Sequence, residues 1–223
     1  MNDVVILVPA RGGSKRLPGK NIRSLCGKSL LRWTAEAIQK GAPNIPIFLS
    51  TDNAAIAEEG HNLGWTVPFM RPASLATDVA SSVEVAVHFL DFLAEKNIQP
   101  KILLLLQPTS PFRSPGILNE AIALMELSLE IPAVVSMKRL DRVPATTFTL
   151  NSKGGVTPLS SSQSPLLTPN GALYAIRVPI LYEKRTFIPE GSVPLIQDQI
   201  ESIDIDTAFD WRVAESFSSE WDR

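Results

Sequence analysis

The stretch that decides the fold lies near the start of the chain and reads Val4-Val5-Ile6-Leu7-Val8, followed by Pro9-Ala10-Arg11-Gly12-Gly13-Ser14-Lys15. Its first five residues form a short, mostly β-branched apolar run, which is typical of a buried strand. The proline and the glycines that follow end the strand and begin a loop. The stretch therefore predicts a buried strand that carries a basic, glycine-rich loop at its end.

Short apolar runs and longer amphipathic segments alternate through most of the remaining sequence. We expect strands over residues 4–8, 45–50, 65–69, 101–106, 133–137, 171–178 and 199–205, and helices over residues 30–40, 53–63, 81–97, 115–129 and 207–216. This order predicts a Rossmann-like α/β fold, with a mostly parallel sheet sandwiched by helices. Ligands of such sheets bind beyond the carboxyl ends of the strands. The residues after Val8, Ser50, Leu106 and Met137 should therefore share one functional rim.

The segment 138–170 differs from the rest of the chain. Proline, serine and threonine dominate it, and no helical periodicity survives. We expect an excursion from the sheet, built of hairpins or an extended arm, within a single domain that spans 1–223. Such a protruding arm is the natural candidate for a dimerisation element.

Composition and charge narrow the class of protein. The chain has 223 residues, of which 44% are hydrophobic and 20% charged, an ordinary globular profile. A formal net charge of -2 argues against nucleic acid or an anionic membrane as the main partner. The single cysteine excludes an intrachain disulfide, and no stretch reaches the roughly 18 apolar residues of a membrane span. We expect a soluble cytoplasmic protein.

The loop over residues 9–21 holds three glycines and no acidic residue. Its cations, together with one in the next turn, are Arg11, Lys15, Arg16, Lys20 and Arg23. Glycines let backbone N–H groups approach phosphate oxygens, and the cations neutralise a polyphosphate. The loop matches neither a Walker A motif nor a dinucleotide fingerprint. It indicates a polyphosphate site, with a solvated basic loop as the alternative.

A pair of aspartates near the carboxyl end is the candidate metal site. The stretch Ser202-Ile203-Asp204-Ile205-Asp206 alternates polar and apolar residues, so on a strand both carboxylates would share one face. Two carboxylates so close favour a cation between them, and Mg²⁺ suits carboxylates combined with phosphate oxygens. The alternative is an exposed edge strand in which Asp206 caps the helix that begins at Thr207.

Five segments, in this order, resemble the acylneuraminate cytidylyltransferases, which are the CMP-sialic acid synthetases. They are Ala10 to Lys15 with Pro18 and Lys20-Asn21; Ser50-Thr51-Asp52; Arg71-Pro72 through Asp78 to Ser81-Ser82; Leu106 to Pro111 with Arg113; and Ser202 to Asp206. The resemblance implies a fold of the nucleotide-diphospho-sugar transferase type and a homodimer. It also implies Mg²⁺-dependent transfer of CMP from CTP to the anomeric hydroxyl of a sialic-acid-like nonulosonic acid, with release of pyrophosphate.

The resemblance also implies roles for individual residues. The nucleotide-binding set is Ala10, Arg11, Gly12, Gly13, Ser14, Lys15, Lys20, Asn21, Arg71, Ala80 and Ser82. The residues implied to contact the sugar are Gln107, Asn170 and Gly171. Arg11 and Lys20 would stabilise charge on the phosphates, while Asp204 and Asp206 would hold the magnesium.

The residues alone leave other roles open for three members of this set. Gln107 could simply hold the loop backbone. Arg71 could pair with Asp78. Ser82, like Ser81, is also a suitable N-cap for the following helix.

One departure from the family concerns the acceptor. Family members carry arginines for the sugar carboxylate ahead of the Asn-Gly-Ala segment, whereas residues 161–169 hold no cation here. Either Arg71, Arg139, Arg142 or a partner subunit meets the carboxylate, or the sugar differs. The alternatives are thus another acid, such as pseudaminic, legionaminic or octulosonic acid, or a non-catalytic nucleotide-binding sensor.

Overall fold

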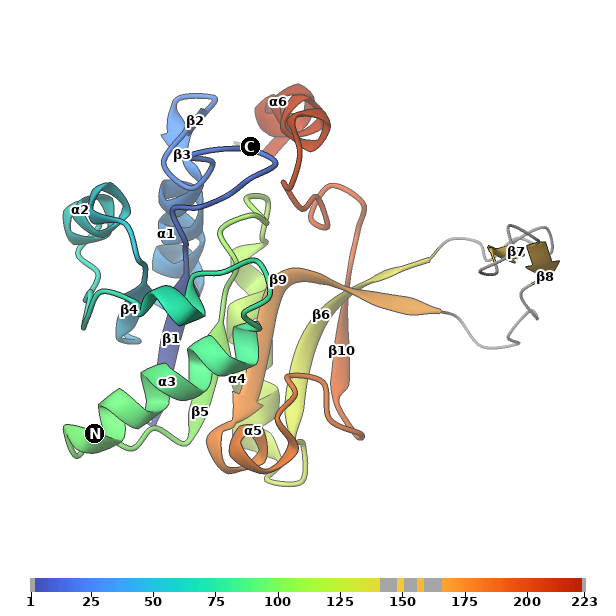
Figure 1. Cartoon of the computed structure of the whole chain (residues 1–223). Coiled ribbons are helices and arrows are strands. Elements are labelled where there is room, and N and C mark those ends of the chain that lie inside the picture. The colour runs from blue at the N-terminus through green and yellow to red at the C-terminus, as the bar shows by residue number, and fades with distance from the viewer. Residues whose placement is uncertain (1–2, 141–147, 151–155, 159–165, 222–223) are drawn as a thin grey trace.

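The computed structural model describes residues 3–140, 148–150, 156–158 and 166–221. Its centre is a six-stranded sheet in the order β10-β6-β9-β5-β1-β4 (Figure 1). These strands are β1 (Val4–Pro9), β4 (Ile47–Ser50), β5 (Ile102–Leu105), β6 (Ala133–Arg139), β9 (Leu167–Arg177) and β10 (Val193–Gln197). Only β9 runs antiparallel to its neighbours β5 and β6, so the predicted mostly parallel α/β sheet is confirmed.

Helices cover both faces of the sheet, as predicted. The helices α1 (Leu30–Gly41), α2 (Ala54–Asn62) and α4 (Pro115–Leu127) pack on one face, and α3 (Ser82–Glu95) and α5 (Val178–Lys184) pack on the other. The side chains of β1 alternate between these two cores, with Ile6 in the first and Leu7 in the second. All four residues of β5 are buried, as expected for a central strand with helices on both sides.

A third hydrophobic cluster supports the functional rim. The helix α6 (Ala208–Trp221) and the hairpin of β2 (Ser24–Leu25) and β3 (Lys28–Ser29) lie beyond the end of the sheet (Figure 1). The cluster joins them to both candidate motifs, because Leu17 of the basic loop and Ile205 of the aspartate segment are both buried in it. Packing therefore brings together two segments that lie far apart in the sequence.

Two predicted strands are wrong. Residues 65–69 pair with β4 only at Thr66, in an isolated bridge to Phe48, because Pro68 has no N–H to extend the ladder; the next bridge joins Met70 to Thr51. Residues 199–205 form turns and a loop, opened where Asp198 accepts a hydrogen bond from the Glu201 N–H at 2.8 Å. The strand lies just before, in β10, where Pro194 is tolerated because β10 is an edge strand.

The arm is shorter than predicted. Residues 138–139 belong to β6 and residues 167–170 to β9, both in the central sheet. Between them lies a two-stranded hairpin of β7 (Phe148–Leu150) and β8 (Val156–Pro158), away from the sheet in Figure 1. The rest of the predicted excursion, including Arg142, lies outside the described residues.

The remaining element is a single 3₁₀ turn, η1 (Ala73–Leu75). No helix in the described ranges is both long and apolar enough to cross a membrane.

Candidate active site

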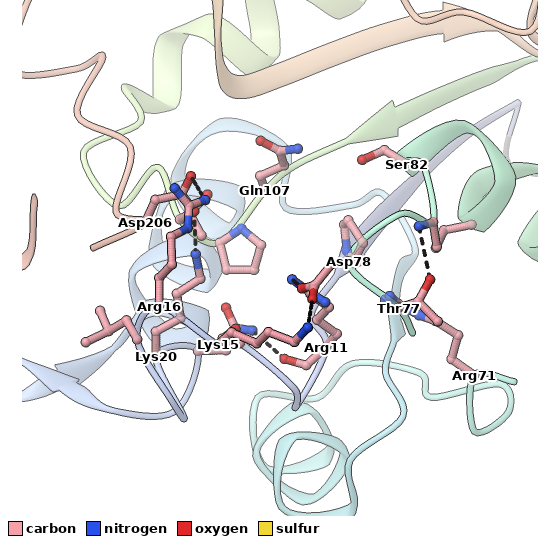
Figure 2. A pocket seen from close by; sticks show the side chains of 18 of the residues that line it. Arg11, Lys15, Arg16, Lys20, Arg71, Thr77, Asp78, Ser82, Gln107 and Asp206 are labelled. Atoms are coloured by element: carbon pink, nitrogen blue, oxygen red, sulfur yellow. Dashed lines mark hydrogen bonds and ion pairs between the residues drawn. The ribbon is translucent and has the colours of Figure 1, made fainter. Parts of the chain in front are cut away.

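A cavity of about 330 Å³ opens at the carboxyl ends of β1 and β5, on the rim that the sequence predicts to be functional. Four segments line it: the basic loop, residues 71–85, the loop after β5 and the aspartate segment. The predicted site residues among its lining are Arg11, Ser14, Lys15, Lys20, Asn21, Arg71, Ala80, Ser82, Gln107, Asp204 and Asp206. Figure 2 shows how these side chains converge from separate segments.

The backbone of the basic loop is fixed by neighbouring segments. The Gly12 N–H donates to Asp52 Oδ1 at 2.8 Å, and a Cβ on Gly12 would lie only 2.8 Å from Asn53 Cβ. Only glycine fits there without displacing the start of α2. Asn21 Nδ2 donates to the Arg11 carbonyl at 3.1 Å, which closes the loop on itself. The loop backbone is thus anchored, while its cationic side chains project into the cavity.

Two of these cations meet Asp78. The Asp78 carboxylate accepts from Arg11 Nη2 and from Lys15 Nζ, each at 2.6 Å (Figure 2). Hydrogen bonds from Lys15 and then Arg11 hold the pKa of Asp78 below its usual value. The possible pairing of Arg71 with Asp78 is therefore not what the structure shows.

The other two cations meet Asp206. Lys20 Nζ donates to Asp206 Oδ1 at 2.8 Å, and Arg16 Nη2 donates to Oδ2 at 2.7 Å. Desolvation alone would raise the pKa of Asp206, but the hydrogen bond and charge of Lys20, together with Arg16, bring it below the usual value. Asp206 does not cap α6, because Thr207 and Asp210 form that cap reciprocally.

Asp204 differs from Asp206 in its electrostatic environment. Surrounding protein desolvates the Asp204 carboxyl and the charge of Asp206 opposes its ionisation, so its pKa is raised although a hydrogen bond from Thr109 favours the charged form. Thr109 also fixes the loop, because its carbonyl accepts from the Ile205 N–H at 2.8 Å. The two aspartates thus stand on one anchored loop, with their pKa values moved in opposite directions.

Arg71 has a structural role in this arrangement. It is only 7% exposed, and its Nε donates to Ser50 Oγ at 3.0 Å while Nη2 donates to the Ser50 carbonyl. Burial lowers its pKa to about 10. Arg71 therefore holds the end of β4 and still lines the cavity.

Ser81 and Ser82 divide two roles between them. Ser81 is the N-cap of α3 and forms a capping box with Glu84. The Ser82 side chain lines the cavity instead (Figure 2).

Gln107 lies at the end of β5 beside Gly171. Gly171 has φ +80°, and a Cβ there would clash with Gln107 Oε1. Arg113 is fully buried and donates from Nη2 to the Gln107 carbonyl at 2.7 Å and from Nε to the Ala172 carbonyl. Arg113 thus joins the two loops, while the Gln107 side chain is left in the cavity wall.

The remaining predicted residues do not line this cavity. Ala10 is buried behind it, and Gly12 and Gly13 shape the loop from behind. Asn170 is 4% exposed, with Nδ2 donating to Gln197 Oε1 at 2.8 Å and to Ser202 Oγ at 3.0 Å. Asn170 and Gly171 therefore support the wall rather than form its surface.

Comparison with known proteins bears on what such a cavity serves. Residues 5–204 match a family model described as cytidylyltransferase. The chain belongs to the cytidylyltransferase family. It is 33% identical over 221 residues to the CMP-N,N'-diacetyllegionaminic acid synthase of Legionella pneumophila, covering 95% of this chain and 94% of that protein. It is 29% identical over 218 residues to the N-acylneuraminate cytidylyltransferase of Escherichia coli, and this match covers 95% of the chain but only 51% of that relative.

The fold agrees with the family. A solved structure of CMP:2-keto-3-deoxy-manno-octonic acid synthetase, complexed with CTP, has a TM-score of 0.72 at 16% identity. That likeness covers 97% of this chain and 98% of the other, and it confirms the fold expected from the resemblance.

The sequence argument gave no individual binding or catalytic role to several lining residues of this cytidylyltransferase. They are Pro9, Arg16, Leu17, Leu75, Thr77, Asp78, Val85, Pro108 and Thr109. Arg16 and Thr109 stand inside segments that had been singled out, so the charge of the one and the hydroxyl of the other were available signals. Asp78 could not be assigned, because its partners come from a different loop.

Asp204 and Asp206 fit a magnesium ion as a partial ligand set. Both line the cavity, and each raises the electrostatic cost of ionising the other unless positive charge lies nearby. Within the described ranges no third aspartate, glutamate, histidine or cysteine gathers with them. The other ligands would be phosphate oxygens and water, which is how Mg²⁺ is usually held at nucleotide sites.

Proposed function

We propose that this cytidylyltransferase transfers CMP from CTP to the anomeric hydroxyl of a sialic-acid-like nonulosonic acid and releases pyrophosphate. The observation that carries the proposal is the cavity itself, in which four cations of one anchored loop pair with Asp78 and Asp206, and Asp204 lines the same cavity. The similarity to the Legionella synthase, along nearly the full length of both proteins, supports an acceptor of the legionaminic or sialic type.

The triphosphate would bind along the basic loop. Arg11, Lys15, Arg16 and Lys20 are held there by Asp78 and Asp206, so phosphate oxygens would take over contacts that carboxylates make in this structure. The remaining contacts of the nucleotide would come from Ser14, Asn21, Arg71, Ala80 and Ser82, which line the cavity, while Ala10, Gly12 and Gly13 would shape the loop behind them. Gln107 would face the acceptor from the adjacent wall.

In the proposed reaction, the anomeric oxygen attacks the α-phosphorus in line. A bond forms between this oxygen and phosphorus, the bond from phosphorus to the β-phosphate bridging oxygen breaks, and pyrophosphate leaves. One of the two aspartates, Asp204 or Asp206, would also orient the hydroxyl and accept its proton. Arg11 and Lys20 would stabilise the charge that develops on the phosphates.

We also propose that Asp204 and Asp206 hold Mg²⁺. The ion, when bound, neutralises charge on the reacting and leaving phosphates. For that, Lys20 and Arg16 would release the Asp206 oxygens and turn to the triphosphate, which is within reach because they line the same cavity. A homodimer formed through the arm, and a cytoplasmic location, complete the proposal.

The test is the identity of the product. The purified protein would be incubated with Mg²⁺, each of the four nucleoside triphosphates and a panel of nonulosonic and octulosonic acids, with products identified by mass. We expect a CMP–sugar conjugate from CTP and a nonulosonic acid. A conjugate with another nucleotide, or tight CTP binding with no conjugate from any acid, would contradict the proposal and favour the sensor.

A further inference from the structure

Arg113 is fully buried, at 0% exposure, and the reaction proposed above gives it no part. No carboxylate in the described part of the chain forms an ion pair with it. Burial alone lowers its pKa to about 9, so the guanidinium is still charged at neutral pH. A buried charge without a counterion carries a large desolvation cost.

The hydrogen bonds of Arg113 use only part of the guanidinium. Nε donates to the Ala172 carbonyl, and Nη2 donates to the Gln107 carbonyl at 2.7 Å. Nη1 has no hydrogen-bond partner among the described residues. Neutral carbonyls satisfy two donors, but they do not cancel the net charge. The charge of Arg113 is therefore left uncompensated in the interior.

A second arginine forms similar bonds without the same burial. Arg177 donates from Nε to the Ile131 carbonyl at 3.0 Å and from Nη2 to the carbonyls of Met125 and Ser128 at 2.6 and 2.8 Å. Arg177 is only half-buried and lies at the opposite end of β9, so water can solvate its charge. Fastening loops through their carbonyls thus does not require a fully buried cation.

Arg113 lies directly behind one wall of the cavity. Gln107, whose carbonyl it binds, lines the cavity, and Gly171 packs against the Gln107 side chain just before Ala172. The guanidinium is thus separated from the cavity by about the thickness of one residue. Its field reaches the wall through protein rather than through water, so it is weakly screened. This wall should therefore favour an anionic ligand group.

The proposed reaction contains one anion that still lacks a cationic partner. The cations of the basic loop serve the phosphates. The acceptor also carries a carboxylate, on the same carbon as the reacting hydroxyl. Residues 161–169 hold no cation for it, and Arg71 is engaged with Ser50. Gln107, which would face the acceptor, is the residue that Arg113 holds from behind.

We infer that Arg113 is a positioning residue for the carboxylate of the acceptor. Its uncompensated charge makes the wall of Gln107 and Gly171 favour an anion, and its two hydrogen bonds hold that wall in place. The side-chain amide of Gln107 supplies the direct hydrogen bond to the carboxylate. The bound carboxylate in turn offsets the charge of Arg113. The inference rests on the proposed function and adds to it the residue that selects an ionised acceptor.

The test compares the acid that gives a conjugate with its carboxamide, in which a neutral group replaces the carboxylate. Calorimetry would measure the binding of each to protein saturated with a non-hydrolysable CTP analogue. A unit charge acting across roughly 8 Å at an effective dielectric constant of about 20 changes affinity by about tenfold or more. Wild type should therefore prefer the acid by at least that factor. Arg113→Gln should lose most of this preference, whereas Arg113→Lys, which keeps the charge, should retain it.

Arg177→Gln is the matched control, because it removes an arginine that also bonds only to carbonyls but does not line or border the cavity. It should lower the melting temperature and leave the preference unchanged. If Arg113→Gln weakens the binding of acid and carboxamide by the same factor, Arg113 only fastens the two loops and the inference is overturned, while the proposed function stands. A loss of preference in Arg113→Lys as large as in Arg113→Gln would also overturn it.

The wild-type protein gives a result that does not depend on the folding of any variant. Equal affinity for the acid and the carboxamide would overturn the inference, since the wall would then not distinguish a charged from a neutral group. If no acid forms a conjugate at all, the proposed function fails and takes this inference with it.

Discussion

Lys20 Nζ lies 2.8 Å from Asp206 Oδ1 and 2.8 Å from the carbonyl oxygen of Ile205, so one lysine joins the basic loop to the segment before α6. Lys20 and Asp206 are 186 residues apart in the sequence. Ile205 and Leu17 are buried in one cluster behind this contact. Hydrophobic packing thus holds a cation and a carboxylate at the same cavity, and the following predictions test what each is for.

Replacement of Asp204 should affect the stability of the fold and the turnover of substrate in different ways. The pKa of Asp204 is raised, so its ionised form is disfavoured in the folded protein, and this lowers stability as pH rises through the folded pKa. Asp204→Asn should therefore keep or raise the melting temperature at neutral pH. It should reduce turnover on the order of 100-fold or more while CTP still binds. Calorimetry with CTP and a thermal melt check both, and full turnover in the variant would remove Asp204 from the reaction.

Asp206 should show the opposite pH dependence. Its folded pKa is depressed, so its contribution to stability is present above the ordinary carboxyl pKa of about 3.9 and is lost as pH falls through the folded value. Wild type should exceed Asp206→Asn in unfolding free energy at neutral pH, by less than about 1 kcal/mol because the ion pairs are partly exposed. The difference should vanish in acid, as measured by urea unfolding across pH. A difference that grows in acid would contradict the ion-pair account.

Asp78 should compete with the triphosphate for Arg11 and Lys15. Asp78→Asn is expected to tighten CTP binding roughly two- to fivefold, the scale of exposed ion pairs. Asp91→Asn is the matched control, since it removes one exposed charge that bonds to Tyr182, and neither residue lines the cavity. Calorimetric titration of CTP compares the two, and weaker binding in Asp78→Asn would mean that Asp78 itself serves the ligand.

Substitutions at Gly171 and Gly191 can separate the effect of backbone strain at positive φ from the effect of a steric clash with Gln107. Both have positive φ, +80° and +84°, so alanine at either should lower stability by about 1 kcal/mol. A Cβ at Gly171 would clash with Gln107, whereas at Gly191 the nearest atom is Pro132 Cγ at 3.7 Å. Gly171→Ala should therefore raise the KM for the acceptor, and Gly191→Ala should not. Equal kinetics in both variants would show that Gln107 does not face the acceptor.

The sequence predicted the parts of the fold that depend on local signals. The buried run before the basic loop became β1, and Ser29 caps α1 by accepting from the Arg32 N–H. The sequence did not predict the position of β10, because Pro194 gives this edge strand the sequence pattern of a loop. The sequence did not predict that β9 runs antiparallel, because strand direction is set by tertiary pairing, which no local pattern encodes.

Within the candidate site, the same division holds. The cations of the loop and the two aspartates were visible as residue types in known segments. The pairings of Asp78 and the interior position of Asn170 depend on long-range contacts with Arg11 and Gln197. The aspartate segment was predicted as a strand, yet a loop fixed by Thr109 brings both carboxylates to the cavity.

The most direct test of the central claim is pyrophosphate release by the purified protein with Mg²⁺ and CTP, measured with and without a nonulosonic acid. The account predicts release only when both CTP and the acid are present, because the acid's hydroxyl is the nucleophile. Release from CTP alone would show that water is the nucleophile and that the cavity does not serve sugar transfer. No pyrophosphate release with any acid, while CTP binds, would equally contradict the account.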